Sequence, residues 1–563
     1  MKLLASLLGL AVIGAPLFVI VAAITGLCWW LYQDIDGIRG LAIIIKPLSK
    51  LIEEDAFMAI PLFIGAGAIM TEGGLAKRLV DVMRASIGWM PGGLAVASVV
   101  ACMFFAAISG SSPVTLIAVG SIMFPALMQN RYPENFSLGL IMTAGSLGCL
   151  VPPAIAMLIY AIAVQGDGAV DPSELFIAGM VPALVIAGVL SMYSIYTGVT
   201  MADPGASLGK RLVRALLWTL LLFTGPGLLI VGALMGKFDF RVWARQLWSG
   251  FWALLLPIIV LGGIGAGLYV PSEAGAVAVV YALFVTAFVY RELDFPGVVR
   301  VLANAGKLMG MLILIIGLAF SLNEFLTAIE IDAKLEQLVR DWELGPVTFL
   351  LLVNLVLIIL GALMDSISAT LIFAPMLAPI AVNTYGMDPL HFGIVFVVNM
   401  EIGYLMPPVA TNLFVAAAVF KKPFGQVARA VLPTLGMTCA ALVLFMYVPT
   451  CSLGLVNLTR GEPVWSAFPW DGVDGTQREA DPGGASALGN LSVQSMEDTM
   501  NNDGGVGQSA DELLDELEDI YSVETQGGDG DSAATEDGGV PDLGGSFLEQ
   551  FGGAGDDDDD DDE

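Results

Sequence analysis

The sequence consists largely of apolar segments of about 20 residues that carry almost no charge, long enough to cross a bilayer as helices. Hydrophobic residues make up 56% of the 563 residues, and the mean hydropathy is +0.79. No Lys or Arg lies between Arg131 and Lys210, or between Arg340 and Lys421. These patterns predict an all-α integral membrane protein that crosses the bilayer many times.

Two polar or helix-breaking motifs of the form G-x-x-x-P-P interrupt the apolar pattern, at Gly148–Pro153 and at Gly403–Pro408. A double proline breaks a helix because it removes hydrogen-bond donors and clashes with the preceding turn. Within a membrane, such a break is tolerated only where protein or a water-filled cavity satisfies the freed backbone groups. A matched pair of broken helices, one in each half of a chain, is typical of the binding site of a secondary transporter.

A small polar cluster precedes each double proline by a similar distance. The clusters are Ile108–Pro113, which contains Ser-Gly-Ser-Ser, and Gly361–Ser368, which contains Asp-Ser-Ile-Ser. A helical hairpin that enters the membrane and turns back needs small residues and hydroxyls at its tip. The alternative is that Ser and Gly only let helices pack closely. Because the clusters occur twice at matching positions, we predict two re-entrant hairpins.

The charges flanking the apolar segments indicate that the two halves are inverted, since basic loops favour the cytoplasm. The loop after the span near Phe57–Met70 is mainly basic, whereas the loop after the span near Leu308–Phe325 is mainly acidic. After the broken helices the signs reverse, because Gln165–Glu174 is acidic and Phe420–Arg429 is basic. The sequence therefore predicts two inverted-topology repeats.

We divide the chain into four parts. Residues 1–200 form the first half, with a hairpin near 91–128 and a broken helix near 137–164; residues 201–249 form a connector; residues 250–455 form the second half, with a hairpin near 346–382 and a broken helix near 392–419; and residues 456–563 form an acidic tail. In the connector, Leu216–Met235 has basic residues on both flanks, so we interpret it as interfacial or re-entrant. Met1–Tyr32 is interpreted as a retained first span.

The tail carries nearly all of the net charge of −30, because Gly461–Glu563 contains 29 Asp or Glu residues and one Arg. Low hydrophobicity and high charge predict disorder there. Ser509–Tyr521 has an N-cap signal and an apolar face, so it could form a docking helix for a partner. Counting the predicted spans places the tail in the periplasm.

Several motifs together resemble the large membrane subunit of a tripartite ATP-independent periplasmic (TRAP) transporter. They are the G-x-x-x-P-P pair, the Ser-Gly-Ser-Ser cluster, Ala59–Ile64, Pro271–Ala274 and Pro407–Phe414, and the resemblance covers about residues 1–455. It implies an elevator-type transporter of a bacterial inner membrane, driven by a sodium gradient. It also implies three partners: a small four-helix membrane subunit, a periplasmic solute-binding protein and an organic acid substrate. Ala154 and Ala410 replace the usual Ser and Gly of the family.

The breaks and the hairpin tips supply the candidate site residues. An anionic substrate would be held by helix N-termini, hydroxyls and bound cations, because no basic side chain lies in these stretches. The candidate substrate-binding residues are Ser109, Gly110, Ser111, Ser112, Pro152, Pro153, Ser366, Pro407, Pro408, Thr411 and Asn412. Freed carbonyls suit Na⁺, and the candidate sodium ligands are Ser109, Gly145, Gly148, Asp365, Ser368 and Gly403. Asp365 could instead cap the helix at the hairpin tip, and Glu401 could either couple to an ion or bond to a neighbouring helix.

Other functional classes find little support. His391 is the only histidine, and neither an H-E-x-x-H motif nor a P-loop is present, so we predict neither an enzyme nor ATP-driven transport. The five scattered cysteines indicate core positions, and we expect no organic cofactor and no nucleic-acid partner. The remaining alternatives are a stand-alone sodium-coupled anion transporter of related fold and a membrane scaffold that does not transport.

Overall fold

A computed structural model describes residues 22–23, 25–27, 55–205, 207–224, 226–236, 238–329, 331–364, 366–407 and 410–469. The chain divides into two compact units, residues 1–477 and 478–563, and every described residue belongs to the first. Most of the predicted first span lies outside the described residues, as do the tail beyond residue 469 and its Ser509–Tyr521 segment. The predictions for the tail therefore stay predictions.

Every regular element in these ranges is a helix, which confirms the predicted all-α class. The α-helices are α4 (Asp55–Glu72), α5 (Leu75–Ile87), α6 (Gly93–Ser109), α7 (Ser112–Gln129), α8 (Glu134–Ser146), α9 (Ile155–Ala163), α10 (Pro172–Ala202), α11 (Leu208–Phe223), α12 (Pro226–Leu234), α13 (Phe240–Gly265), α14 (Pro271–Phe284), α15 (Phe295–Ala328), α16 (Ile331–Asp341), α17 (Pro346–Leu363), α18 (Ser366–Asn383), α19 (Pro389–Tyr404), α20 (Thr411–Phe420), α21 (Phe424–Tyr447) and α22 (Thr450–Arg460). Short 3₁₀ or π turns occupy Leu147–Cys149, Gly166–Gly168 and Val285–Val289.

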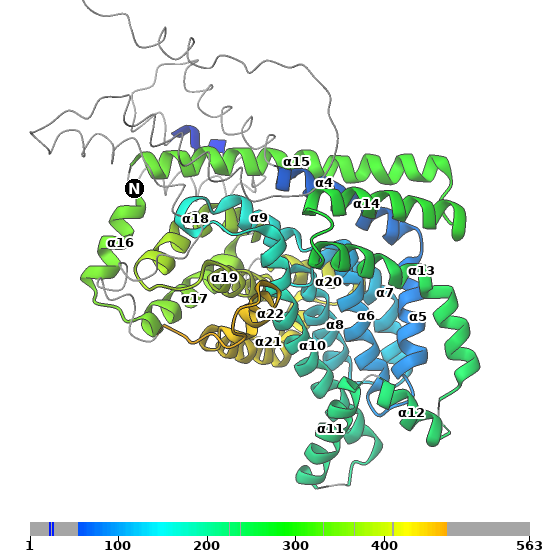
Figure 1. Cartoon of the computed structure of the whole chain (residues 1–563). Coiled ribbons are helices and arrows are strands. Elements are labelled where there is room, and N and C mark those ends of the chain that lie inside the picture. The colour runs from blue at the N-terminus through cyan, green and yellow to red at the C-terminus, as the bar shows by residue number, and fades with distance from the viewer. Residues whose placement is uncertain are drawn as a thin grey trace, which may run out of the picture. The chain divides into compact units, whose positions relative to one another are not determined.

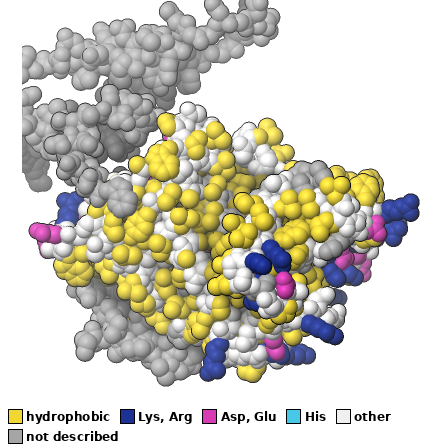
Figure 2. All heavy atoms as spheres, turned by 90° about the horizontal axis from the view of Figure 1, so that it is seen from below, with side chains coloured by type: hydrophobic (Ala, Val, Ile, Leu, Met, Phe, Trp, Pro, Cys, Tyr) yellow, Lys and Arg dark blue, Asp and Glu magenta, His cyan; other side chains and the backbone are white. Residues whose placement is uncertain are grey.

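Among the described helices, eight are long and apolar enough to cross a membrane. They are α7, α10, α13, α14 with the π turn that follows it, α15, α17, α18 and α21. A further pair, α4 and α5, passes the same criteria jointly but bends by 70° between its two parts. The surface agrees with a lipid environment, because hydrophobic side chains cover much of the face seen in Figure 2, with most Lys and Arg toward its edge. The protein is a multi-pass membrane protein.

The predicted hairpin tips and helix breaks coincide with the ends of helices. Helices α6 and α7 meet at Gly110, whose φ of 58° lies in the left-handed region that favours glycine. Helices α17 and α18 end and begin at Leu363 and Ser366, with Asp365 between them outside the described residues. Each G-x-x-x-P-P motif separates two helices, α8 from α9 and α19 from α20.

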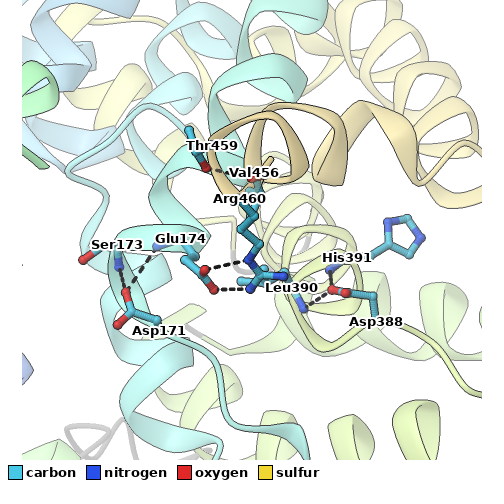
Figure 3. A network of polar contacts seen from close by, with 9 residues as sticks. All are labelled: Asp171, Ser173, Glu174, Asp388, Leu390, His391, Val456, Thr459 and Arg460. Atoms are coloured by element: carbon cyan, nitrogen blue, oxygen red, sulfur yellow. Dashed lines mark hydrogen bonds and ion pairs between the residues drawn. The ribbon is translucent and has the colours of Figure 1, made fainter. Parts of the chain in front are cut away.

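Two ion pairs show that the hairpins open toward opposite ends of the helix bundle. Glu134, just after the first hairpin, pairs with Lys422, just after α20. Glu174, near the start of α10, pairs with Arg460 at the end of α22, close to the start of α19 that follows the second hairpin (Figure 3). Because α8–α9 and α19–α20 each connect these two ends in opposite directions, the halves are related as an inverted repeat.

Two long helices of matching position in the halves, α4 and α15, pack against each other, and α14 packs on α4. In Figure 1 these three helices lie together at the top of the view. Helix α4 also contacts α6 and α9, while α15 contacts α18. Elements of both halves are therefore joined to this helix pair.

The connector contains α11 and α12, and neither is long enough to satisfy the criteria for a membrane span. Helix α11 exposes a row of apolar side chains that includes Leu212, Leu216 and Leu220. The predicted boundary at residue 250 falls inside α13, which begins at Phe240 because Asp239 caps it by accepting from two backbone N–H groups. The interfacial or re-entrant placement of 216–235 stays a prediction.

Candidate functional site

One cavity of about 250 Å³ lies where the tips of both hairpins meet α4 and α15. Its polar lining comes from the first tip, from the second tip and from the two broken helices. Its apolar lining comes mainly from α4 and α15. The lining residues are Ile64, Gly67, Ala68, Ser109, Gly110, Ser111, Ser112, Pro113, Val114, Cys149, Ile155, Ala156, Leu308, Met311, Leu312, Ile315, Ser366, Ile367 and Tyr404. The structure thus brings together segments that are more than 250 residues apart in the sequence.

The first hairpin tip holds itself together by hydrogen bonds between its own polar groups. The Ser109 and Thr115 hydroxyls lie 2.8 Å apart, and Thr115 Oγ1 donates to the Ser111 carbonyl at 2.9 Å. The backbone N–H of Ser111 donates to Ser109 Oγ at 3.4 Å. These bonds replace the helical bonds that are missing at the tip, and they fix Ser109, Ser111 and Ser112 beside the cavity.

The first broken helix presses its backbone against this tip. A Cβ at Gly148 would lie 2.8 Å from the carbonyl carbon of Ser111, and a Cβ at Gly110 would lie 2.5 Å from the Pro153 carbonyl oxygen. The backbone N–H of Ile155 also donates to the Gly110 carbonyl, at 3.3 Å. Pro152 and Pro153 are buried behind the tip and do not line the cavity. Gly145 lies one turn earlier, against Leu116 of α7.

The second tip repeats this arrangement with different residues. A Cβ at Gly403 would lie 2.6 Å from Cα of Gly361, so α19 and α17 touch through their backbones. Ser366 lines the cavity, and Ser368 is buried one turn further along α18. Pro407 is exposed. Of the other candidates here, Asp365 and Pro408 lie outside the described residues, and Thr411 is described only as the first residue of α20.

The two halves are joined directly at the first tip. Asn412 Nδ2, from the second broken helix, donates to Ser112 Oγ at 2.6 Å. A second link between the halves connects Thr143 of α8 to Thr434 of α21, with the two hydroxyl oxygens 2.7 Å apart. Asn412 therefore belongs to the same cluster as the first tip, although it lies 300 residues away.

Sequence reasoning missed the apolar wall of the cavity. Leu308, Met311, Leu312 and Ile315 of α15 line it, and the sequence marked this helix only as a span. A cavity wall of this kind has no local signal, because its residues are as apolar as those that face lipid. Cys149 and Tyr404 also line the cavity, and both lie inside the G-x-x-x-P-P motifs, where their spacing could have singled them out.

The electrostatics of the cavity are unusual for a site that would take an anion. None of the lining residues that the structure describes is basic. Beside the cavity, Glu401 is 2% exposed, and neither of its carboxylate oxygens accepts a hydrogen bond from the described residues. The Asn412 side-chain oxygen is likewise buried without a donor. Buried oxygen acceptors that lack donors suit bound cations, so the residues present fit Na⁺.

His391 does not form a catalytic site in the described part of the chain. Its Nδ1 lies 2.8 Å from the Ser452 hydroxyl, and Ser452 is fully buried. The Asp388 carboxylate accepts from the backbone N–H groups of Leu390 and His391 and caps α19, and it does not orient the imidazole (Figure 3). This histidine ties α19 to α22.

The chain matches the family model described as "Tripartite ATP-independent periplasmic transporter, DctM component" over residues 4–451. The chain belongs to this family. It is therefore a large permease component of a transporter and not an enzyme, as the sequence predicted. The match ends before the acidic tail, which begins at residue 456.

Similar proteins carry the same description. The C4-dicarboxylate TRAP transporter large permease protein DctM of Pseudomonas aeruginosa is 41% identical over 422 residues, covering 75% of this chain and 90% of that protein. The protein of the same name from Vibrio cholerae is 36% identical over 481 residues, covering 81% of this chain and 97% of that protein. The ectoine TRAP transporter large permease protein TeaC of Halomonas elongata is 29% identical, covering 81% and 98%.

A solved structure shares the fold. The YdaH transporter of Alcanivorax borkumensis matches with a TM-score of 0.53 and 13% identity, over 80% of this chain and 98% of that one. The predicted fold class, with re-entrant hairpins, broken helices and inverted repeats, agrees with the helix order and with this likeness.

Proposed function

We propose that this permease imports an organic acid by sodium symport across the inner membrane of a bacterium. A small four-helix membrane subunit would complete the membrane part, and a periplasmic solute-binding protein would deliver the substrate. Two relatives named as C4-dicarboxylate permeases, at 41% and 36% identity, support a dicarboxylate as the first substrate to test.

The observation that carries the proposal is the cavity between the hairpin tips, which has hydroxyl groups and helix ends on one side and no basic side chain in its described lining. A carboxylate in this cavity would accept from the hydroxyls of Ser111, Ser112 and Ser366. The N-termini of α7 and α18, at Ser112 and Ser366, add the positive ends of two helix dipoles. The two tips would thus bind one substrate from opposite directions.

Sodium supplies the positive charge that this cavity lacks. Ser109, Gly145 and Gly148 would hold one ion at the first tip, and Asp365, Ser368 and Gly403 would hold its counterpart at the second. The glycines contribute through backbone carbonyls that the helix breaks leave without intrahelical partners. When bound, the ions neutralise the repulsion between a dianionic substrate and the carbonyl oxygens around it.

The wall of α15 explains how the tips could move as a unit. Leu308, Met311, Leu312 and Ile315 contact the cavity only through apolar groups. A wall without polar contacts loses no hydrogen bond when the hairpins slide along it. This supports the elevator-type movement that the sequence resemblance implies.

Reconstitution tests the proposal. The complete transporter in proteoliposomes should take up a labelled C4-dicarboxylate when Na⁺ is present outside, at fixed membrane potential and pH. Undiminished uptake with K⁺ in place of Na⁺ would contradict sodium coupling. Equal uptake without the solute-binding protein would favour the stand-alone anion transporter, and no uptake under any condition would favour a scaffold.

A further inference from the structure

Glu401 is a buried carboxylate that the two hairpin sites do not use. It lies in α19 two residues before Gly403, and it is 2% exposed. The described residues form five ion pairs, and none of them includes Glu401. A carboxylate that is buried without a positive partner is very costly, so something else must balance its charge.

The side chains around Glu401 do not supply this balance. Ser112, Ser146 and Cys149 surround the carboxylate, yet none of them donates to it at hydrogen-bond distance and geometry. The Ser146 hydroxyl proton is already engaged, since Ser146 Oγ donates to the Thr143 carbonyl at 2.7 Å. A thiol is only a weak donor, so Cys149 cannot replace a charged partner.

A second acceptor without a donor adjoins the same group of residues. Asn412 is fully buried, and its Nδ2 is used by Ser112 Oγ, which leaves its Oδ1 without a donor. Ser112 is thus next to both Glu401 and Asn412. Three oxygen atoms without donors, from two fully buried side chains, therefore gather around one hydroxyl at the junction of the two halves.

We propose that Glu401, Asn412 and Ser112 form a third sodium site, separate from the two symmetry-related sites at the tips. This inference rests on the proposed sodium coupling and adds to it one ion that is held by a formal negative charge. A proton on Glu401 would answer only one of the three acceptors, whereas a cation answers all three. Because Ser112 also lines the cavity, this ion would lie directly behind the substrate.

Binding of Na⁺ to the purified permease tests the site without a transport assay. Thermal unfolding in NaCl, with choline chloride keeping the ionic strength constant, reports the concentration that gives half of the full stabilisation. For Glu401→Gln, which keeps the shape and removes the charge, we expect half-saturation to rise by roughly tenfold or more. Asn412→Asp adds a second carboxylate, so its half-saturation should fall below that of the wild type. Glu174→Gln, which loses only the surface pair with Arg460, is the matched control and should keep the wild-type value.

The outcomes separate this inference from the proposed function. If Na⁺ stabilises the wild type and Glu401→Gln equally and at the same concentrations, the third site is wrong and the tip sites remain. If Na⁺ does not stabilise the wild type at all, sodium coupling itself fails. Should Glu401→Gln not fold, Asn412→Asp still decides, because an unchanged or weaker response to Na⁺ in that variant would overturn the site.

Discussion

The two hairpin tips do the same task with different local chemistry. The first tip is a closed network, in which Ser109, Thr115 and the Ser111 backbone satisfy one another and Gly110 takes the left-handed conformation. The second tip meets its broken helix through Gly361 and Gly403. The comparison shows that the repeat preserves where the backbones touch more strictly than it preserves which side chains touch.

The halves also differ just after their double prolines. Helix α9 begins at Ile155, two residues after Pro153, and its N-cap Ala154 has an ordinary φ of −91°. Helix α20 begins at Thr411, three residues after Pro408, and its N-cap Ala410 has a φ of 30°. The extra residue in the second break thus coincides with a left-handed alanine, at the position where related proteins usually have glycine.

Filling the cavity from either tip should have the largest effect. We expect Ser111→Trp and Ser366→Trp each to reduce uptake by about 100-fold or more, because an indole would take up much of a cavity of about 250 Å³. Leu351→Trp, at a half-exposed site on α17, is the control and should transport normally. Uptake in proteoliposomes and the amount of inserted protein are measured together. Normal uptake by both serine variants would contradict a shared cavity.

Adding a methyl group at the backbone contacts should cost each half a similar amount. Gly148→Ala and Gly403→Ala place a Cβ within 3 Å of backbone atoms, so we expect each to lose about 1–3 kcal/mol of stability. Gly262→Ala in α13, where nothing lies within 4 Å, should be neutral or stabilising. Thermal unfolding in detergent measures all three. A cost in only one half would show that the contacts are not equivalent.

Relieving the left-handed alanine should stabilise the second half. We expect Ala410→Gly to raise stability by about 1 kcal/mol, since its φ of 30° favours glycine. Ala417→Gly, the same change inside α20, should lower stability by about 0.5–1 kcal/mol. Opposite shifts in the unfolding temperature would support the difference between the two breaks, and a loss of stability at both sites would remove it.

The surface pair between Glu134 and Lys422 should have the smallest effect. Lys422 bonds to the Glu134 carboxylate and lowers its pKa. The stabilisation is therefore present at neutral pH, above the pKa of an unfolded glutamate, and is lost as the pH falls through the lowered pKa. The unfolding temperatures of the wild type and Glu134→Gln should differ slightly at pH 7 and converge in acid. Asp341→Asn, which removes no ion pair of the described residues, should show no such convergence.

Much of this organisation was predictable from the sequence, because it depends on local rules. The double prolines at Pro152 and Pro407 must break helices, and the Ser-Gly-Ser-Ser cluster at Ser109 suits a hairpin tip, so these elements could be located without a structure. The charges around Lys422 and Glu174 gave the inversion for the same reason.

The remainder depends on packing between distant segments. The bond from Asn412 to Ser112 crosses 300 residues, and neither residue type announces its partner. The α15 wall around Met311 is apolar in the same way as a lipid-facing surface. Asp365, which the sequence placed at the second tip, lies outside the described residues, so its choice between capping and ion binding remains a prediction.

The most direct test of the account uses Cys149, which lines the cavity and is 9% exposed. In a variant whose other four cysteines are replaced by serine, the rate of alkylation by a small maleimide reports access to the cavity. We predict that Na⁺ together with the transported dicarboxylate slows alkylation by about tenfold, a difference of roughly 1.4 kcal/mol in protection, and that K⁺ with the same substrate does not. An alkylation rate that Na⁺ and substrate leave unchanged, in a variant that still shows sodium-dependent uptake, would place the transport site elsewhere.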